Sequence, residues 1–381
     1  MMRAFLFALA VLIFPSHTWA YDSGARALYV IDHETGTVLL EKNAQVPLPP
    51  ASMSKLMTLY MVFEALKEGR LGLTSTFPVS EKAWQMGGSK MFLKAGDNIA
   101  IEDLLRGIIV QSGNDACIVV AEGLAGSEAE FANRMTKRAR QLGMENSIFA
   151  NSTGWPHPDH RMSAQDLVFL ASNMIREFPE YYGYFAERSF EWEGIEQDNR
   201  NPLLAMDVGA DGLKTGHTEE AGYGLVGSAE QDGRRIVFML TGLPSASERA
   251  QESQRLVSWA FREFSKEVLF KKDEVITTAD VWLGDSATVD LVPAGPVEII
   301  VPYATRDELT AEVRYKGPIE APIERGDEIA ELLITVPGIS DTSIPLLAGA
   351  SVGKGGFLGR FLASGQILGQ KVLDAATSST Q

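Results

Sequence analysis

Cysteine is nearly absent from this sequence, and its scarcity limits how the fold is held together. Cys117 is the single cysteine, so no disulfide can form within one molecule. Stability must therefore come from the packed core alone. Cys117 lies in the apolar run 116–121, which favours a packed thiol over a reactive one.

Positive charge is also scarce, because 34 Lys and Arg face 50 Asp and Glu for a formal net charge of −16. This balance argues against nucleic acid as a partner. Anionic lipid would repel such an acidic body, so any membrane contact must come from a local exception to the charge.

The chain lacks an apolar N-terminal run long enough to cross a bilayer. Residues 4–14 form an apolar run of 11 residues, whereas a transmembrane helix takes about 20. Arg3 precedes the run, and Thr18 and Ala20 are small residues at −3 and −1 of a cleavage site. We expect 1–20 to be a signal peptide and the protein to be exported; the alternative is a buried N-terminal helix. Cleavage removes Arg3 and no acid, so −16 becomes −17.

The C-terminal stretch 351–381 is the local exception to the acidic charge. It carries Lys354, Arg360 and Lys371 against a lone Asp374, for a net charge of +2. Its apolar residues recur at helical spacing, at Phe357, Phe361, Leu368 and Val372. We expect an amphipathic tail that lies in a membrane interface; a disordered or domain-packed tail is the alternative.

The length of 381 residues favours two domains, since one domain usually takes ~100–200. We expect a first domain at 21–267 that combines an antiparallel sheet with helices (α/β, α+β). A β-rich domain at 268–350, built as a small β-sandwich, should follow it. The sheet strands of the first domain are predicted at 26–31, 37–41, 212–217, 223–229 and 235–240, and a closing helix at 247–264.

The first motif is Ser52-Met53-Ser54-Lys55. It lies between residues 49–51 and a predicted apolar helix. A spacing of three places Ser52 and Lys55 one turn apart on a helical face, close enough for a neutral amine to take the hydroxyl proton. Burial and the positive end of the helix dipole should both lower the pKa of Lys55. The same spacing recurs at Ser351 and Lys354, in a glycine-rich stretch without a buried helix, and we interpret that copy as chance.

Ser112-Gly113-Asn114 lies between an apolar run and a second helix, and Gly113 favours a turn there. In a purely structural interpretation Asn114 is a helix N-cap. In a functional one, Ser112 relays a proton to the leaving amine and the Asn114 amide binds the substrate backbone.

Lys214-Thr215-Gly216 falls on a predicted strand whose alternate side chains would face a cleft. Lys214 supplies positive charge and Thr215 a hydroxyl, a suitable pair for a substrate carboxylate. Gly216 would let a ligand approach closely.

The three motifs follow one another at positions 52, 112 and 214, that is, at intervals of 60 and 102 residues. This combination resembles the penicillin-binding and serine β-lactamase superfamily. The stretches 50–55, 111–117 and 211–218 resemble more closely the D-alanyl-D-alanine carboxypeptidase family of low-molecular-mass penicillin-binding proteins. The resemblance implies a serine peptidase that removes the terminal D-alanine from peptidoglycan pentapeptides, binds β-lactam antibiotics and lies at the periplasmic face of the inner membrane.

The resemblance also implies a role for each motif residue. Ser52 would be the acylated nucleophile and Lys55 its general base, with Ser112 as a further catalytic group. The backbone N–H groups of Ser52 and His217 would form the oxyanion hole. Substrate-binding roles would fall to Asn114, Lys214, Thr215, His217 and Arg249.

Several alternatives stay open at this point. A class A β-lactamase would carry a Glu-x-x-Leu-Asn segment, and none occurs between Ser112 and Lys214. A DD-transpeptidase or endopeptidase differs only in the acceptor or in the bond cleaved, and a sensor would bind β-lactam or wall peptide without turnover. The cluster 157–160 holds two histidines, but Pro158 within it and Pro156 before it favour a polar loop over a metal site. No metal or cofactor is expected.

Overall fold

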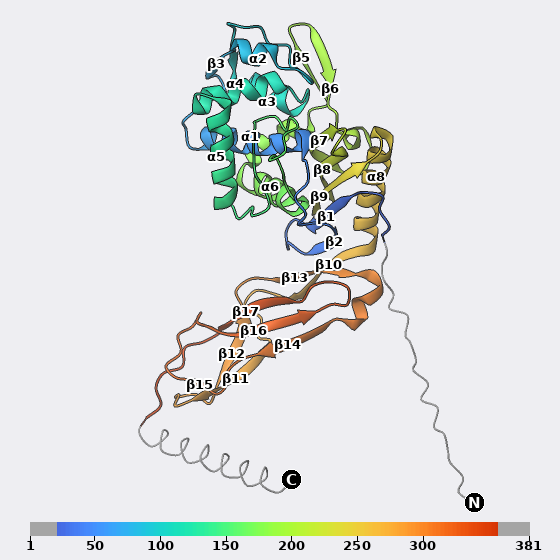
Figure 1. The fold of residues 1–381 in the computed structure, drawn as a ribbon. Coiled ribbons are helices and arrows are strands. Elements are labelled where there is room, and N and C mark those ends of the chain that lie inside the picture. The colour runs from blue at the N-terminus through green and yellow to red at the C-terminus, as the bar shows by residue number, and fades with distance from the viewer. Residues whose placement is uncertain (1–20, 357–381) are drawn as a thin grey trace, which may run out of the picture.

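The computed structural model describes residues 21–356 (Figure 1). The expected signal peptide, 1–20, lies outside the described residues, and so does most of the expected tail, 357–381. Within 21–356, no helix combines the length and the apolar character needed to cross a membrane.

The first domain is built on a five-stranded antiparallel sheet in the order β2-β1-β9-β8-β7. Its strands are β1 (Ala27–Asp32), β2 (Val38–Lys42), β7 (Ala210–Thr218), β8 (Gly222–Gln231) and β9 (Arg234–Leu243). The five predicted strands are confirmed to within a few residues. Tyr29 of β1 pairs with Met239 of β9, so the two ends of the domain share one sheet, as predicted.

Side chains alternate between two cores on the two faces of this sheet. Tyr29 and Ile31 join the larger core, which contains α1 and α6, whereas Leu28 and Val30 join the core under α8. The helices of the domain are α1 (Lys55–Lys67), α2 (Glu81–Gln85), α3 (Ile101–Ile109), α4 (Asn114–Ala125), α5 (Glu128–Gln141), α6 (Ala164–Glu177), α7 (Pro179–Tyr182) and α8 (Ala246–Glu263). Helix α1 is buried on nearly every side, as expected for an apolar helix at the centre of a domain.

Short elements complete the helical region. They are the hairpins β3 (Thr76–Pro78) with β4 (Asn98–Ala100) and β5 (Ser189–Trp192) with β6 (Ile195–Asp198), and the 3-10 turns η1 (Ala51–Ser54), η2 (Gly183–Ala186) and η3 (Pro202–Ala205). Figure 1 places β3, α2 and the β5–β6 hairpin at the end of the molecule farthest from the second domain.

The second domain consists of two sheets around one core. The larger sheet has the order β14-β16-β17-β12-β11-β15, and β10 pairs with β13 in the smaller one. The strands are β10 (Phe264–Phe270), β11 (Thr277–Trp282), β12 (Thr288–Pro293), β13 (Val297–Pro302), β14 (Thr310–Arg314), β15 (Ile319–Glu320), β16 (Glu328–Thr335) and β17 (Thr342–Ala348), with the 3-10 turn η4 (Tyr303–Glu308) between β13 and β14. Ile299 of β13 packs in the same core as Leu332 and Leu346 of the larger sheet. The predicted fold class, an α+β domain followed by a small β domain, is confirmed.

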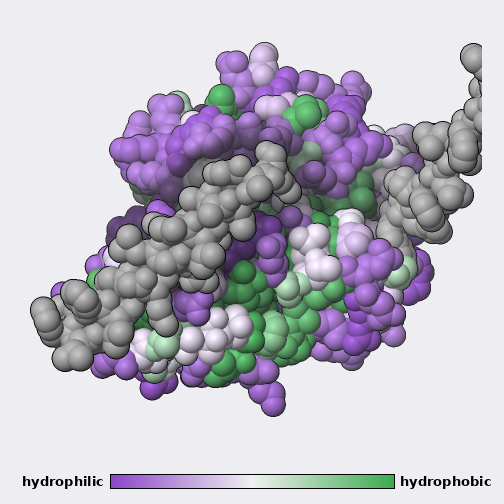
Figure 2. All heavy atoms as spheres, turned by 90° about the horizontal axis from the view of Figure 1, so that it is seen from below, coloured by the Kyte–Doolittle hydropathy of each residue, from purple (hydrophilic) through white to green (hydrophobic). Residues whose placement is uncertain are grey.

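Seen from below, the surface is mostly hydrophilic at its edges, and hydrophobic residues gather in one area (Figure 2). In the second domain, Val268, Val275 and Tyr303 are each more than half exposed. Single exposed apolar residues such as these three are normal on a protein surface.

Candidate active site

The first motif lies at the start of the central helix. Ser52 belongs to the 3-10 turn η1 and is half-buried, and Lys55 opens α1 with its side chain fully buried. The Lys55 ammonium donates a hydrogen bond to Ser52 Oγ at 2.9 Å. The structure therefore brings together the two residues that the spacing of three selected.

Lys55 has two further acceptors around its amine. Nζ donates to Asn114 Oδ1 at 2.7 Å and to the carbonyl oxygen of Thr153 at 2.6 Å. Burial lowers the pKa of Lys55 to about 8, since a buried ammonium loses its hydration. The positive charge of Arg200 acts in the same direction. About half of the Lys55 amine is thus neutral at pH 8, and a smaller fraction is neutral at pH 7, which makes it available as a base.

The second motif forms a strained turn before α4. Ser112 has φ +59°, a backbone conformation that non-glycine residues rarely adopt. The turn predicted at Gly113 is present, and Gly113 itself has φ −56° and is the N-cap of α4. A Cβ on Gly113 would lie 3.2 Å from the carbonyl oxygen of Gly107, so its small size serves close packing. The interpretation of Asn114 as an N-cap is wrong, because its side chain bonds Lys55 and, through Nδ2, the carbonyl of Gly87.

Asp115, directly after this motif, fixes the loop opposite it. Its buried carboxylate accepts hydrogen bonds from the backbone N–H groups of Met91, Phe92 and Leu93 at 2.9–3.2 Å. Three such bonds hold the loop 91–93 against α4 and so support the turn that carries Ser112 and Asn114.

The third motif lies on β7, an edge strand of the five-stranded sheet. Lys214 is buried, and its Nζ donates to Ser112 Oγ at 2.9 Å. Burial lowers the pKa of Lys214 well below its usual value, and the charge of Lys55 adds to the effect. An anion placed beside Lys214 would oppose both causes and restore its positive charge.

Gly216 has a packing role in addition to the ligand approach predicted for it. A Cβ at this position would lie 2.9 Å from the carbonyl oxygen of Pro50 and 3.2 Å from Cβ of Ala51. The glycine therefore lets β7 pack against the turn that holds Ser52. Next along the strand, the His217 ring is exposed and stacks on Tyr223 at a centroid distance of 3.8 Å.

Arg249 reaches the same region from α8. Its side chain is buried, and its guanidinium lies 5.9 Å from the centre of the Tyr223 ring and donates to the carbonyl of Arg200 at 3.4 Å. Its Nε has no protein partner, and its charge is close enough to lower the pKa of Lys214. Thr215, the remaining predicted residue, is buried beside Lys214 on β7.

The predicted polar loop 157–160 has one exposed and one buried histidine. His157 is exposed, whereas His160 is buried and packs edge-on against Phe149. Burial lowers the pKa of His160 to about 4, so its ring is neutral over the physiological range.

Sequence reasoning missed three contributors to this site. The Thr153 carbonyl, the Asp115 carboxylate and the charge of Arg200 all act on the motif residues. A signal existed for the first, since asparagine side chains often accept hydrogen bonds from backbone N–H groups two residues further along, as Asn151 does from Thr153. No local pattern marks the other two.

Comparison with known proteins gives matches along nearly the whole chain. A family model described as D-alanyl-D-alanine carboxypeptidase matches residues 16–243, and one described as the C-terminal domain of penicillin-binding protein 5 matches residues 264–354. D-alanyl-D-alanine carboxypeptidase DacC of Escherichia coli K12 is 36% identical over 367 residues, which cover 94% of this chain and 92% of the relative.

Solved structures give the same result for the fold. Penicillin binding protein 5 from Haemophilus influenzae matches with a TM-score of 0.78 and 33% identity, over 87% of this chain and 98% of that one. Penicillin-binding protein D2 from Listeria monocytogenes, solved in an ampicillin-bound form, matches with a TM-score of 0.57 and 29% identity, over 62% of this chain and 97% of that one. Together with the three motifs, these matches establish that this chain belongs to the D-alanyl-D-alanine carboxypeptidase family of serine peptidases.

Proposed function

We propose that Ser52 is the nucleophile that attacks the carbonyl between the two terminal D-alanines of a peptidoglycan pentapeptide. The contact between Ser52 Oγ and the buried Lys55 amine is the observation that carries this proposal. Attack forms an ester on Ser52 and releases D-alanine, and water then hydrolyses the ester. A β-lactam would form its own ester on the same serine, and the Listeria relative was solved in an ampicillin-bound form.

The proton has a short path in this scheme. Neutral Lys55 takes the proton of Ser52 as the bond to carbon forms. Ser112, whose hydroxyl contacts Lys214, would deliver a proton to the departing amine of D-alanine. The Asn114 amide, held by Lys55 and Gly87, would orient the substrate backbone.

Positive charge at the far end of the cleft would bind the terminal carboxylate. Lys214 and Thr215 lie on the edge strand, and Arg249 approaches from α8. The developing oxyanion would be bound by the backbone N–H groups of Ser52 and His217. An edge strand suits this role, because its outer backbone groups are not used within the sheet.

Hydrolysis is favoured over the rival activities by what surrounds the nucleophile. The segment next to Lys55 presents Thr153, Gly154 and Trp155, with no glutamate to activate water as in a class A β-lactamase. Transpeptidation would need a second amine to reach the ester, and the chain has a single catalytic domain.

Mass spectrometry after brief exposure to penicillin, with peptide mapping, tests the proposal together with a D-alanine release assay on a pentapeptide. We expect one adduct on Ser52 and release of D-alanine by the same preparation, and neither from Ser52→Ala. An adduct without release would indicate a transpeptidase or a sensor. An adduct elsewhere, or none, would refute the assignment of Ser52.

We further propose that residues 1–20 direct export and that the stretch 351–381 attaches the enzyme to the periplasmic face of the inner membrane. The stretch 351–381 has a net charge of +2, whereas the whole chain has −16. Anionic lipid headgroups would attract this stretch and repel the rest of the protein, which supports the proposal. Deleting 354–381 should move the protein from the membrane to the soluble fraction of the cells. Deleting only 374–381, which removes no basic residue, should leave the protein in the membrane fraction. If both truncated forms stay in the membrane fraction, the proposal is wrong.

A further inference from the structure

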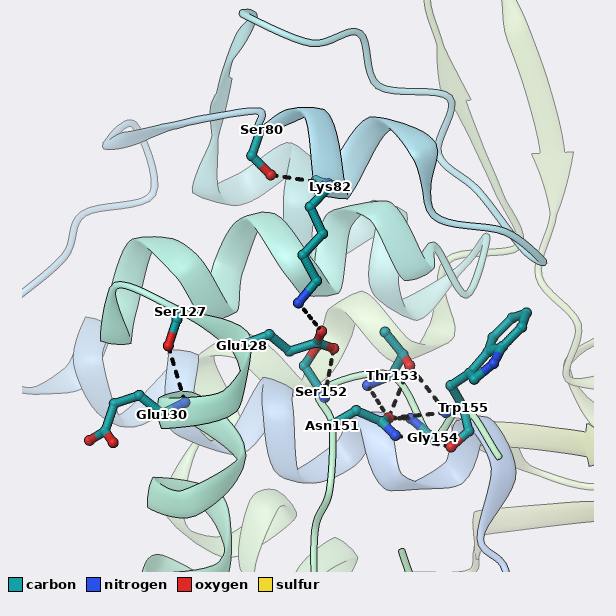
Figure 3. A network of polar contacts seen from close by, with 11 residues as sticks. Ser80, Lys82, Ser127, Glu128, Glu130, Asn151, Ser152, Thr153, Gly154 and Trp155 are labelled. Carbon is teal, nitrogen blue, oxygen red and sulfur yellow. Dashed lines mark hydrogen bonds and ion pairs between the residues drawn. The ribbon is translucent and has the colours of Figure 1, made fainter. Parts of the chain in front are cut away.

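A tight turn at 151–155 supplies the carbonyl group that contacts Lys55. The Asn151 side-chain oxygen accepts hydrogen bonds from the backbone N–H groups of Thr153, Gly154 and Trp155 at 3.1, 2.8 and 3.0 Å. Figure 3 shows these bonds converging on one atom. A single side chain thus fixes the backbone on both sides of the Thr153 carbonyl.

A carboxylate holds the same turn from the opposite side. Glu128, the first residue of α5, accepts hydrogen bonds through Oε1 from the Ser152 hydroxyl at 2.9 Å and from its N–H at 3.2 Å. Its Oε2 pairs with Lys82 of α2 at 2.7 Å, as Figure 3 also shows. The Glu128 side chain is only 12% exposed, so these bonds are largely shielded from water.

Ser152 is also fixed to the central helix. Its carbonyl oxygen accepts a hydrogen bond from the Thr58 hydroxyl at 2.7 Å. Thr58 lies on α1, one turn after Lys55. The turn therefore has a fixed place relative to the amine, with Glu128 on one side and α1 on the other.

The position of the Thr153 carbonyl is important because of the number of hydrogens that a neutral Lys55 amine carries. A neutral amine has two N–H groups and one lone pair. Asn114 Oδ1 and the Thr153 carbonyl, both closer to Nζ than Ser52 Oγ is, can take the two N–H groups. The lone pair then faces the Ser52 hydroxyl, which is the orientation that proton abstraction needs. Without the Thr153 carbonyl, the amine could rotate its lone pair away.

We propose that Glu128 is a positioning residue for acylation: it holds Ser152 so that the Thr153 carbonyl orients the Lys55 amine toward Ser52. This inference rests on the proposed role of Lys55 as the general base. Glu128 does not contact the reacting atoms, and it acts through the turn alone.

The Glu128→Ala variant tests the inference through the rate at which penicillin acylates the enzyme, followed as a function of pH. For the wild type, we expect the rate to rise with pH through the Lys55 pKa of about 8 and to level off at higher pH, where the amine is neutral. In the variant we expect a rate at least ~10-fold lower, since small misplacements of a catalytic group are costly. We also expect the rise to shift to higher pH, because a loosened turn admits water that stabilises the charged amine.

Matched variants separate positioning from a general loss of structure. Glu130→Ala changes a carboxylate in the same first turn of α5 that pairs instead with Arg134, and it should acylate like the wild type. Glu128→Gln keeps an oxygen for Ser152 and should retain most of the rate. If Glu128→Ala does not fold, as judged by circular dichroism, Ser152→Ala removes one of the bonds and should show a smaller decrease with the same direction of pH shift.

Two results would overturn the inference. One is an unchanged rate and pH profile in folded Glu128→Ala, or in Ser152→Ala where the first variant does not fold. The other is a lower melting temperature with an unchanged pH profile, which a merely structural role would give. Failure of the proposed function has a different outcome, because the wild type itself would then form no adduct on Ser52.

Discussion

Replacing Lys55 with methionine is expected to lower the rate of acylation by penicillin by ~10³-fold or more, within the 10²–10⁴-fold range usual for loss of a general base. Methionine has a similar length and fills the same buried space, but it cannot take the proton of Ser52. The turn η1 should keep its place, because Gly216 and Gly154 pack against Pro50 and Ala51 rather than against Lys55.

Stopped-flow measurement of adduct formation would check this result. Lys354→Met is the matched control, because Ser351 and Lys354 repeat the spacing of the first motif in another setting. Lys354 is exposed, and its backbone forms an isolated antiparallel β-bridge with Gly284. Ser351 Oγ accepts a hydrogen bond from the backbone N–H of Arg325. This control should acylate at the wild-type rate. A Lys55→Met variant within tenfold of the wild type would show that another group is the base.

The three motifs were predictable because each is local. Short apolar runs beside the turns at 33–36 and 232–233 indicated the strands 26–31 and 235–240, and the structure confirms both as β1 and β9. The contact of Ser52 with Lys55 follows from helical spacing alone. The motif order then indicated the family, which in turn implied that positions 52, 112 and 214 meet in one cleft.

What the sequence did not reveal depends on contacts between distant segments. Glu128 lies 24 residues from Ser152, and no periodicity links a helix start to a loop that far along the chain. The packing role of Gly216 was not apparent for the same reason, since the atom nearest to a Cβ there belongs to Pro50. The turn at 112–113 was predicted from Gly113, but the sequence did not indicate that Ser112 is its left-handed residue.

What was missed at these glycines has a common physical origin. A glycine pattern says that space or backbone freedom is needed, but it does not say which segment needs the space. At Gly216 the neighbour is the turn that carries the nucleophile, so the packing of the sheet also determines the geometry of the site. The dependence of the site on close packing is strongest at Gly154.

Gly154→Ala is expected to lower the acylation rate by ~100-fold or more and the free energy of unfolding by about 2–5 kcal/mol. Gly154 has φ +78°, where a Cβ costs about 1–2 kcal/mol. The added Cβ would also lie 1.8 Å from the carbonyl oxygen of Ala51, so either the turn 151–155 or η1 must move. One of these segments carries Ser52 and the other carries the carbonyl that contacts Lys55.

Gly126→Ala separates backbone strain from displacement of the site, since Gly126 has φ +77° at the end of α4 and its Cβ would meet nothing within 4 Å. This control should lose only the ~1–2 kcal/mol of the backbone conformation and keep acylation within twofold of the wild type. Urea unfolding and the penicillin reaction, measured on both variants, give the two quantities. Equal acylation rates in the two variants would mean that the packing of Gly154 against Ala51 does not hold the nucleophile in place, whereas a slow Gly154→Ala beside a normal Gly126→Ala would show that it does.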